Sequence, residues 1–156
     1  MNNDLSHLKE TDDQKEYISL KIGDQHFGIS VYAVRDILAP QKITSIPLAP
    51  VEVAGSLNLR GRIVTAINIK FILDIDSNIE LNKCMSIVVE YQGELYSLIV
   101  DSIGEVLTLS KKDFIHNPEN FPSNLKDISL GIYPLKDKLL IILDIEKLLQ
   151  SIAKNN

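Results

Sequence analysis

The feature that most constrains the fold of this chain is an internal repeat. Residues 16–38 align without a gap with residues 85–107, which lie 69 positions later, and the apolar register is preserved throughout. A second gapless pair follows in the same order, because residues 55–73 match residues 131–149 at an offset of 76. Self-similarity of this kind predicts two copies of one supersecondary unit.

The two predicted units cover about residues 16–76 and 84–153, and together they form one domain over residues 15–153. A chain of 156 residues is about one domain long and can bury a core without disulfides. Residues 1–14 are polar, charged and aperiodic, so we interpret them as a flexible tail. The extra length of the second unit is assigned to residues 110–124, a predicted surface loop rich in Asn and Pro.

The hydrophobic pattern within each unit is that of short strands. Residues 16–31 alternate apolar and polar positions on both sides of a Gly-Asp-Gln turn, which predicts a hairpin. Ser30 then stands where it can cap a short helix that runs to Leu38. Residues 62–67 and 138–143 are apolar on both faces. One face can therefore fill a barrel while the other packs on a helix or on the sister unit.

About five strands and a terminal helix are expected in each unit. An open sheet of this size leaves unpaired edges, and closure into a barrel removes them. Asn68 and Asp144 precede the apolar stripes of the two terminal helices and are predicted N-caps. The predicted fold is mainly β, with two tandem five-stranded small β-barrels, short helices, and a C-terminal helix packed on the barrels.

A basic turn interrupts the strand pattern of the first unit. Arg60 and Gly61 form a predicted two-residue hairpin turn, in which Gly61 supplies the positive φ, and the repeat aligns this turn with Lys136 and Asp137. Arg60 either recognises a partner or pairs with Asp36 inside the first unit. The two roles are compatible, because a charge held by an internal partner is a better recognition element.

Composition excludes several classes of protein. A net charge of −5 argues against broad contact with nucleic-acid phosphates, and no apolar segment reaches the roughly 20 residues of a membrane span. The N-terminal residues lack the features of a secretory signal, so a cytoplasmic location is expected. Cys84 is the single cysteine and is interpreted as a packing residue.

The sequence also lacks a catalytic constellation. His7, His26 and His116 have no spacing that converges ligands on a metal. Asp101 and Glu105 are interpreted as solvated charges rather than an acid–base pair. Phosphate loops, dinucleotide motifs and nucleophile elbows do not occur. We therefore expect no enzyme activity, cofactor or metal.

At residues 55–73 the chain resembles a known family. The stretch GSLNLRGRIVTAINIKFIL is similar to the signature of the CheW family of bacterial chemotaxis coupling proteins, about G-x-x-N-L-R-G-x-x-x-P-V-x-D-L-R. The likeness extends over residues 16–152, through a segment of strand, short helix and acidic residue upstream and a strand and helix at the C-terminal end. It implies a non-catalytic adaptor of two interlocked five-stranded barrels.

The resemblance also implies partners and contact residues. Such adaptors link the cytoplasmic tips of chemoreceptors to the regulatory domain of a CheA-type histidine kinase, in arrays at the inner face of the membrane. It places receptor contacts on Val34, Asp36, Asn58, Leu59, Arg60 and Gly61, and kinase contacts on Ile43 and Thr44. From the residues alone, Val34 serves equally well as a core residue, since one apolar stripe suits both roles.

The chain departs from the family signature at three positions. Thr65, Asn68 and Lys70 stand where Pro, Asp and Arg are usual. Lys cannot replace Arg where planar pairing matters, so partner affinity or identity can differ. Two alternatives stay open: a coupling protein of a related array that controls pilus motility or gene expression, and, less favoured, a small-molecule sensor or enzyme that uses the cleft between barrels.

Overall fold

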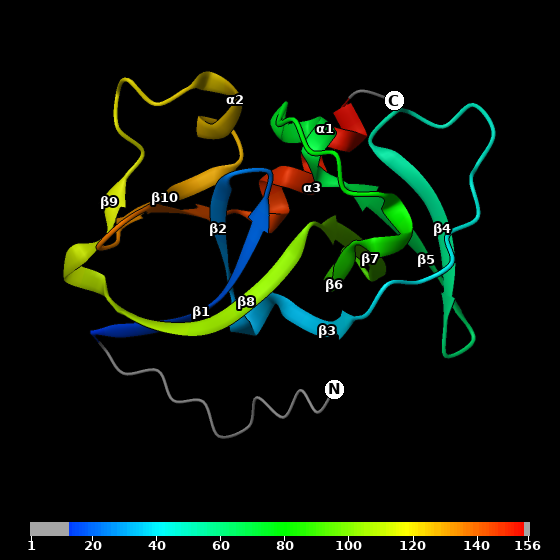
Figure 1. Cartoon of the computed structure of the whole chain (residues 1–156), viewed down its shortest axis with the longest axis horizontal. Coiled ribbons are helices and arrows are strands. Elements are labelled where there is room, and N and C mark those ends of the chain that lie inside the picture. Colours follow the sequence, from blue (N-terminus) through cyan, green and yellow to red (C-terminus); the bar gives the residue numbers. More distant parts are fainter. Residues whose placement is uncertain (1–12, 155–156) are drawn as a thin grey trace.

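The computed structural model describes residues 13–154, in which strands form two sheets and short helices lie between and beside them (Figure 1). Most of the predicted tail, residues 1–14, lies outside this part of the chain. Gln14, the last residue of the predicted tail, is the first residue of strand β1. The first strand therefore starts two residues before the hairpin predicted from residue 16.

The two sheets are here named A and B. Sheet A has the strand order β8-β1-β2-β11-β10-β9 and sheet B the order β3-β6-β7-β5-β4. The strands of sheet A are β1 (Gln14–Ile22), β2 (Gln25–Ser30), β8 (Ser102–Ser110), β9 (Ile115–His116), β10 (Ser129–Pro134) and β11 (Leu139–Leu143). Those of sheet B are β3 (Val34–Leu38), β4 (Val53–Leu59), β5 (Arg62–Asn68), β6 (Met85–Tyr91) and β7 (Glu94–Val100). The α-helices are α1 (Ile69–Leu73), α2 (Ser123–Lys126) and α3 (Ile145–Lys154), and short 3-10 turns lie at Val31–Ala33, Leu81–Lys83 and Lys111–Asp113.

The repeat is present in the strand registers. Ser19 pairs with Gly28 across β1 and β2, and the aligned residues Val88 and Ser97 pair across β6 and β7. The parallel pairs agree as well, because β2 runs beside β11 in sheet A as β7 runs beside β5 in sheet B. The two sheets are therefore two copies of one arrangement.

The division of the chain between the copies differs from the predicted one. We expected one barrel from residues 16–76 and the other from residues 84–153. Instead, the β1–β2 hairpin of the first repeat lies in sheet A, between β8 and β11 of the second repeat. The β6–β7 hairpin of the second repeat lies in sheet B, between β3 and β5 of the first. Each sheet thus exchanges a hairpin with the other, which agrees with the interlocked arrangement that the resemblance implied.

The mainly β class with two sheets and short helices is confirmed, but hydrogen bonding does not close either sheet into a barrel. Strands β8 and β9 end sheet A, and β3 and β4 end sheet B, with a further backbone bridge from Thr44 to Ser56 beside β4. Sheet A also has six strands rather than five. Each sheet instead curls around its own apolar cluster.

Three apolar clusters hold the fold together. The largest lies between the sheets, where Phe27 and Ile29 of sheet A and Ile87 and Leu98 of sheet B are fully buried. Helix α3 contributes Leu148 to this cluster, which confirms that the C-terminal helix packs on the two units. A second cluster fills the curl of sheet B and a third fills that of sheet A. Both faces of each sheet are therefore used, as predicted for residues 62–67 and 138–143.

One local prediction fails and another holds in part. Residues from Ser30 to Leu38 form one 3-10 turn and then strand β3 rather than a helix, although the Ser30 hydroxyl does accept a hydrogen bond from the Tyr32 amide at 3.3 Å. The β-branched residues of this segment pair with β6, and this tertiary pairing overrides the helical spacing. Asn68 stands at the N-cap of α1 without a capping side-chain bond, whereas the Asp144 carboxylate accepts from the Lys147 amide at 3.2 Å.

Candidate functional site

The predicted basic turn has a fixed backbone. Leu59 pairs with Arg62, so Arg60 and Gly61 are the two residues of the turn, with φ values of 51° and 84°. Two positive φ values in succession are those of a type I′ hairpin turn. The Asn58 side-chain oxygen accepts a hydrogen bond from the Gly61 amide at 2.9 Å and stabilises this conformation. The turn is thus held in place before any partner binds.

An ion pair connects the turn to the opposite edge of sheet B. The Arg60 guanidinium lies 3.1 Å from the Asp36 carboxylate, which stands on edge strand β3. The Asp36 carboxylate also accepts a hydrogen bond from the Ile37 amide at 2.8 Å. Its side chain is 16% exposed, whereas that of Arg60 is 78% exposed. Asp36 therefore anchors a guanidinium that still faces solvent.

An exposed apolar residue follows the turn on β5. Ile63 is the cross-strand partner of Asn58, and 79% of Ile63 is exposed, whereas the next residue, Val64, is fully buried. Sequence reasoning did not single it out, because residues 62–67 were treated as uniformly apolar. We call Asp36, Asn58, Arg60 and Ile63 the seam site, since they lie where the two edges of sheet B approach each other.

Two of the predicted receptor contacts have little exposed surface. Val34 is 8% exposed and belongs to the cluster between the sheets, so of its two possible roles the structure shows the packing one. Leu59 is half-buried and packs against the cluster inside sheet B. Both residues therefore have packing roles, while Asn58, Arg60 and Gly61 are exposed.

The predicted kinase contacts lie beside the middle of β4. Thr44 exchanges two backbone hydrogen bonds of 2.8 Å with Ser56, and Gly55 permits this approach because a Cβ there would meet the Thr44 carbonyl oxygen. The φ of Gly55 is 150°, which other residues rarely adopt. Thr44 is exposed, whereas Ile43 is half-buried against the cluster of sheet B.

Sequence reasoning missed the apolar surface that follows this segment. Ile46, Leu48 and Val51 are 42%, 105% and 66% exposed and lie in the connection between Thr44 and β4. Exposed apolar residues close together often mark interaction surfaces. The signal was available in the stretch SIPLAPVEV, whose apolar residues follow neither a helical nor a strand period.

The three departures from the family signature have structural roles. Lys70 donates from Nζ to the Ser77 carbonyl at 3.1 Å and lies 5.2 Å from the centre of the Phe71 ring. Asn68 donates its backbone amide to the Glu52 carbonyl at 2.7 Å. Thr65 is half-buried between β4 and β7. Thr65 lies in the middle of β5, Asn68 is the last residue of that strand and Lys70 lies in α1, so all three are C-terminal to the turn.

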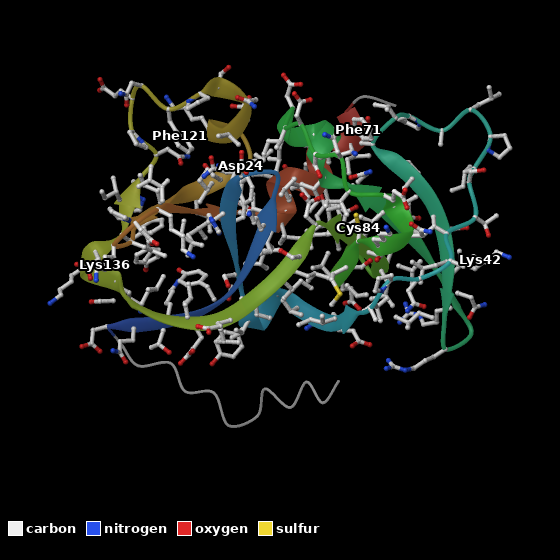
Figure 2. The ribbon with its side chains drawn as sticks, in the orientation of Figure 1. Asp24, Lys42, Phe71, Cys84, Phe121 and Lys136 are labelled. Carbon is white, nitrogen blue, oxygen red and sulfur yellow. The ribbon has the colours of Figure 1, made fainter. Side chains whose placement is uncertain are left out.

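The titratable residues outside the seam site are dispersed. Asp101 is half-buried and accepts from the Gly23 amide and the Ser77 hydroxyl, both at 2.8 Å, so the interpretation as a solvated charge is wrong for Asp101. Within residues 13–154, no group of three His, Cys, Asp or Glu residues could hold a metal ion. Cys84 packs inside sheet B, as expected, and burial raises the pKa of its thiol (Figure 2).

Comparison with known proteins gives the family. A family model described as the CheW-like domain matches residues 16–153. The chain belongs to the CheW family. The chemotaxis protein CheW of Rhizobium meliloti is 25% identical over 151 residues, which cover 97% of this chain and 96% of that protein. CheW of Thermotoga maritima is 28% identical, with 88% and 89% covered.

A solved structure agrees with the fold. The scaffolding protein TtCheW from Thermoanaerobacter tengcongensis matches with a TM-score of 0.78 and 26% identity, over 86% of this chain and 91% of that one. Together with the relatives named as chemotaxis proteins, this match identifies the chain as a chemotaxis coupling adaptor of the CheW family. The resemblance seen in residues 55–73 is therefore confirmed at the level of the family.

Proposed function

We propose that this CheW-family adaptor couples the cytoplasmic helical hairpin of a chemoreceptor to a CheA-type histidine kinase without catalysing a reaction. The observation that carries the proposal is the Arg60 guanidinium, which is fixed by Asp36 and yet 78% exposed. A side chain whose position is set before binding loses less conformational entropy when a partner arrives. Arg60 can therefore set the register of a helical partner.

The seam site suits a helix of the receptor. Helix recognition needs an apolar contact and a few fixed polar groups. Ile63 supplies the apolar contact, Arg60 the charge and Asn58 the structural support of the turn. An acidic or amide side chain on the receptor helix would bind the guanidinium edge that Asp36 leaves free.

The kinase contact is proposed for the segment at Ile43 and Thr44. Thr44 pairs with Ser56, four residues before Arg60, so the two contacts are about 13 Å apart along β4 at about 3.3 Å per residue. The exposed residues Ile46, Leu48 and Val51 extend this surface away from the turn. One partner beside the middle of β4 and another at the turn that follows it would let the adaptor hold receptor and kinase at once.

The proposal includes the place of action. None of the helices in the described part of the chain is long and apolar enough to cross a membrane. We therefore propose that the receptor contact recruits the protein from the cytoplasm to arrays at the inner face of the membrane. Weak individual contacts suffice there, because arrays multiply them.

Binding to a receptor fragment tests the proposal. Arg60→Ala should weaken binding of a purified receptor cytoplasmic hairpin by about 30-fold in calorimetry, as expected for a charged residue at the centre of an interface. Arg62→Ala is the matched control, because Arg62 is also exposed and lies two residues away. Equal affinities for both variants and the native protein would contradict the receptor assignment. Capture of partners from the source cell would then separate chemotaxis from a related kinase array.

A further inference from the structure

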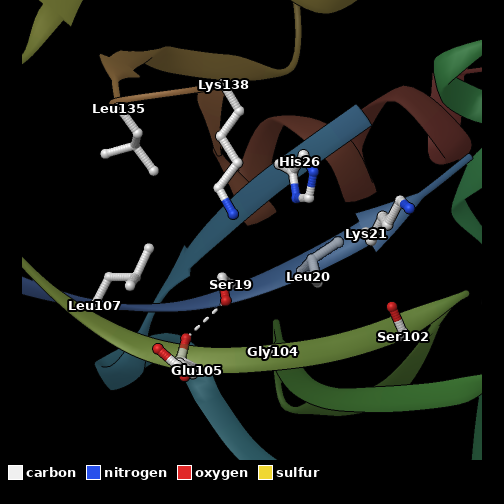
Figure 3. A pocket seen from close by; sticks show the side chains of 10 residues that line it. All are labelled: Ser19, Leu20, Lys21, His26, Ser102, Gly104, Glu105, Leu107, Leu135 and Lys138. Carbon is white, nitrogen blue, oxygen red and sulfur yellow. Dashed lines mark hydrogen bonds between the residues drawn. The ribbon is translucent and has the colours of Figure 1, made fainter. Parts of the chain in front are cut away.

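Sheet A contains a cavity at the position that corresponds to the seam site. Its volume is about 380 Å³, and it lies between β1 and β2, edge strand β8 and the turn that joins β10 to β11 (Figure 3). Leu107 on β8 and Leu135 on the turn face it from opposite sides. In sheet B, the Asp36–Arg60 ion pair connects the equivalent elements, which are edge strand β3 and the turn that joins β4 to β5.

The cavity exists because two residues of the repeat differ between the copies. Val88 and Leu95 fill the corresponding space in sheet B, where both belong to the apolar cluster inside the curl. Their aligned residues in sheet A are Ser19 and His26, and both line the cavity. Ser19 also donates its hydroxyl to the Glu105 carbonyl at 2.7 Å, so it is directed to the rim rather than to the middle.

The ion pair of the seam site has no counterpart here. Glu105 aligns with Asp36 and Lys136 with Arg60, yet the two form no salt bridge within the described part of the chain. Lys136 is exposed at the far end of the molecule (Figure 2). In the described part of the chain, sheet A thus lacks the ion pair that connects the edge strand to the hairpin turn in sheet B.

The lining is basic on balance. Lys138 reaches from the β10–β11 turn over the cavity towards Ser19, and His26 lies beside it on β2 (Figure 3). Lys21 stands at the rim on β1, and Glu105 is the acidic residue of the lining. Burial and the charges of Lys138 and Lys21 lower the pKa of His26, while Asp137 opposes this shift. The two lysine charges exceed the single charge of Glu105, so the lining favours a bound anion.

We propose that this cavity of sheet A binds an acidic side chain of a partner protein, a carboxylate on a short aliphatic stem. Lys138 and Lys21 would bind the carboxylate, and His26 would donate to it. Leu107 and Leu135 supply apolar surface for the stem. The open rim admits a side chain that projects from another protein. This site goes beyond the proposed function and does not depend on the receptor contact at Arg60.

Titration with a model peptide tests the site. The probe is N-acetyl-Gly-Glu-Gly-amide, compared with the Gln peptide of the same shape, and ¹⁵N NMR follows the full-length protein. We expect saturable shifts centred on Lys21, His26 and Lys138, and a rise in the pKa of the His26 imidazole, because a bound carboxylate stabilises the imidazolium. Equal shifts with the Gln peptide, or shifts that do not saturate, would overturn the proposal without any variant.

Charge reversal locates the contact. Lys138→Glu should weaken binding of the Glu peptide at least about fivefold, as expected for loss of a partly exposed ion pair. Lys112→Glu is the matched control, because Lys112 is exposed and lies outside the cavity lining, and it should leave the affinity unchanged. Equal losses in the two variants would overturn the proposal. Binding of free glutarate without binding of the Glu peptide would also overturn it, because the ligand would then be a small acid.

Discussion

Sheets A and B share one strand order and one register, and they differ where an edge strand meets the hairpin turn of the opposite edge. In sheet B, Asp36 on the edge strand fastens Arg60 on the turn at 3.1 Å, above a filled apolar interior. In sheet A, the corresponding place is a cavity of about 380 Å³ beside Ser19 and His26. The two copies of one unit thus differ at this place, because one has an ion pair and the other has a cavity.

The two sheets therefore arrange their charged side chains differently. In sheet B, the Asp36 carboxylate holds the Arg60 guanidinium in place, where we propose that it contacts the receptor. In sheet A, Lys21, His26 and Lys138 lie around a space that their own chain does not fill. We propose that the first arrangement contacts a helix of the receptor and that the second binds an acidic side chain.

Exchange of residues between the copies should show the largest effect. Val88→Ser should lower the free energy of unfolding by about 2–4 kcal/mol, because Val88 is 1% exposed and the change leaves a void and buries a hydroxyl. Ser19→Val at the aligned position adds apolar surface beside the cavity, removes the hydrogen bond to the Glu105 carbonyl and should change stability by less than about 1 kcal/mol. Urea unfolding measures both. Equal destabilisation would show that the interiors do not differ as described.

Replacement of two glycines should distinguish the crowded strand position at Gly55 from the open turn at Gly61. Gly55→Ala should cost about 2–3 kcal/mol, because a Cβ would meet the Thr44 carbonyl and the φ of 150° is unfavourable. Gly61→Ala should cost about 1 kcal/mol, since its φ is 84° but no atom lies within 4 Å of the added Cβ. Thermal unfolding of the two variants gives the comparison. A greater loss at Gly61 would contradict the account of the Thr44 bridge.

Loss of the ion pair should have a small effect on stability. Arg60→Ala should keep a cooperative transition and lower the unfolding free energy by about 1 kcal/mol or less, because the Arg60 side chain is 78% exposed. For a chain of this size that corresponds to a midpoint shift of roughly 2–4 °C at most. Calorimetry measures the shift, and its reduction in high salt is the control. Collapse of the transition would show that Arg60 is chiefly structural.

The thiol inside sheet B should show the smallest effect on the fold. Burial raises the pKa of Cys84, so the folded state holds the thiol proton more tightly than the unfolded state does. Stability should therefore decrease slightly as the pH rises through the ordinary thiol range. Alkylation by iodoacetamide should be slow in the native protein and fast in urea. Rapid native alkylation would mean that the interior of sheet B is open.

Local sequence patterns predicted individual elements and their register well. The hairpin of residues 16–31 and the turn at Arg60 and Gly61 are present, because each depends on neighbouring residues or on strongly typical turn residues. The Asp36–Arg60 pair, one of the two roles considered for Arg60, is also present, but it depends on how the two edges of sheet B meet. The helix predicted to run from Ser30 to Leu38 is absent, because pairing with β6 decided the conformation of that segment.

The exchange of hairpins between sheets could not be read from alternation of apolar residues. Alternation tells which face of a strand is buried but not which strand is its neighbour. The cavity was visible in principle, since the repeat aligns polar Ser19 and His26 with apolar Val88 and Leu95. Only the fold shows that these positions share one interior.

The most direct test of the seam site is a charge swap that keeps the ion pair and reverses its direction. In Asp36→Arg with Arg60→Asp, we expect the unfolding free energy to return to near that of the native protein, while binding of the receptor hairpin stays weakened by at least about tenfold. Each single change serves as a control for the loss of the pair. Recovery of both stability and receptor binding in the double variant would contradict the claim that the Arg60 guanidinium itself contacts the receptor.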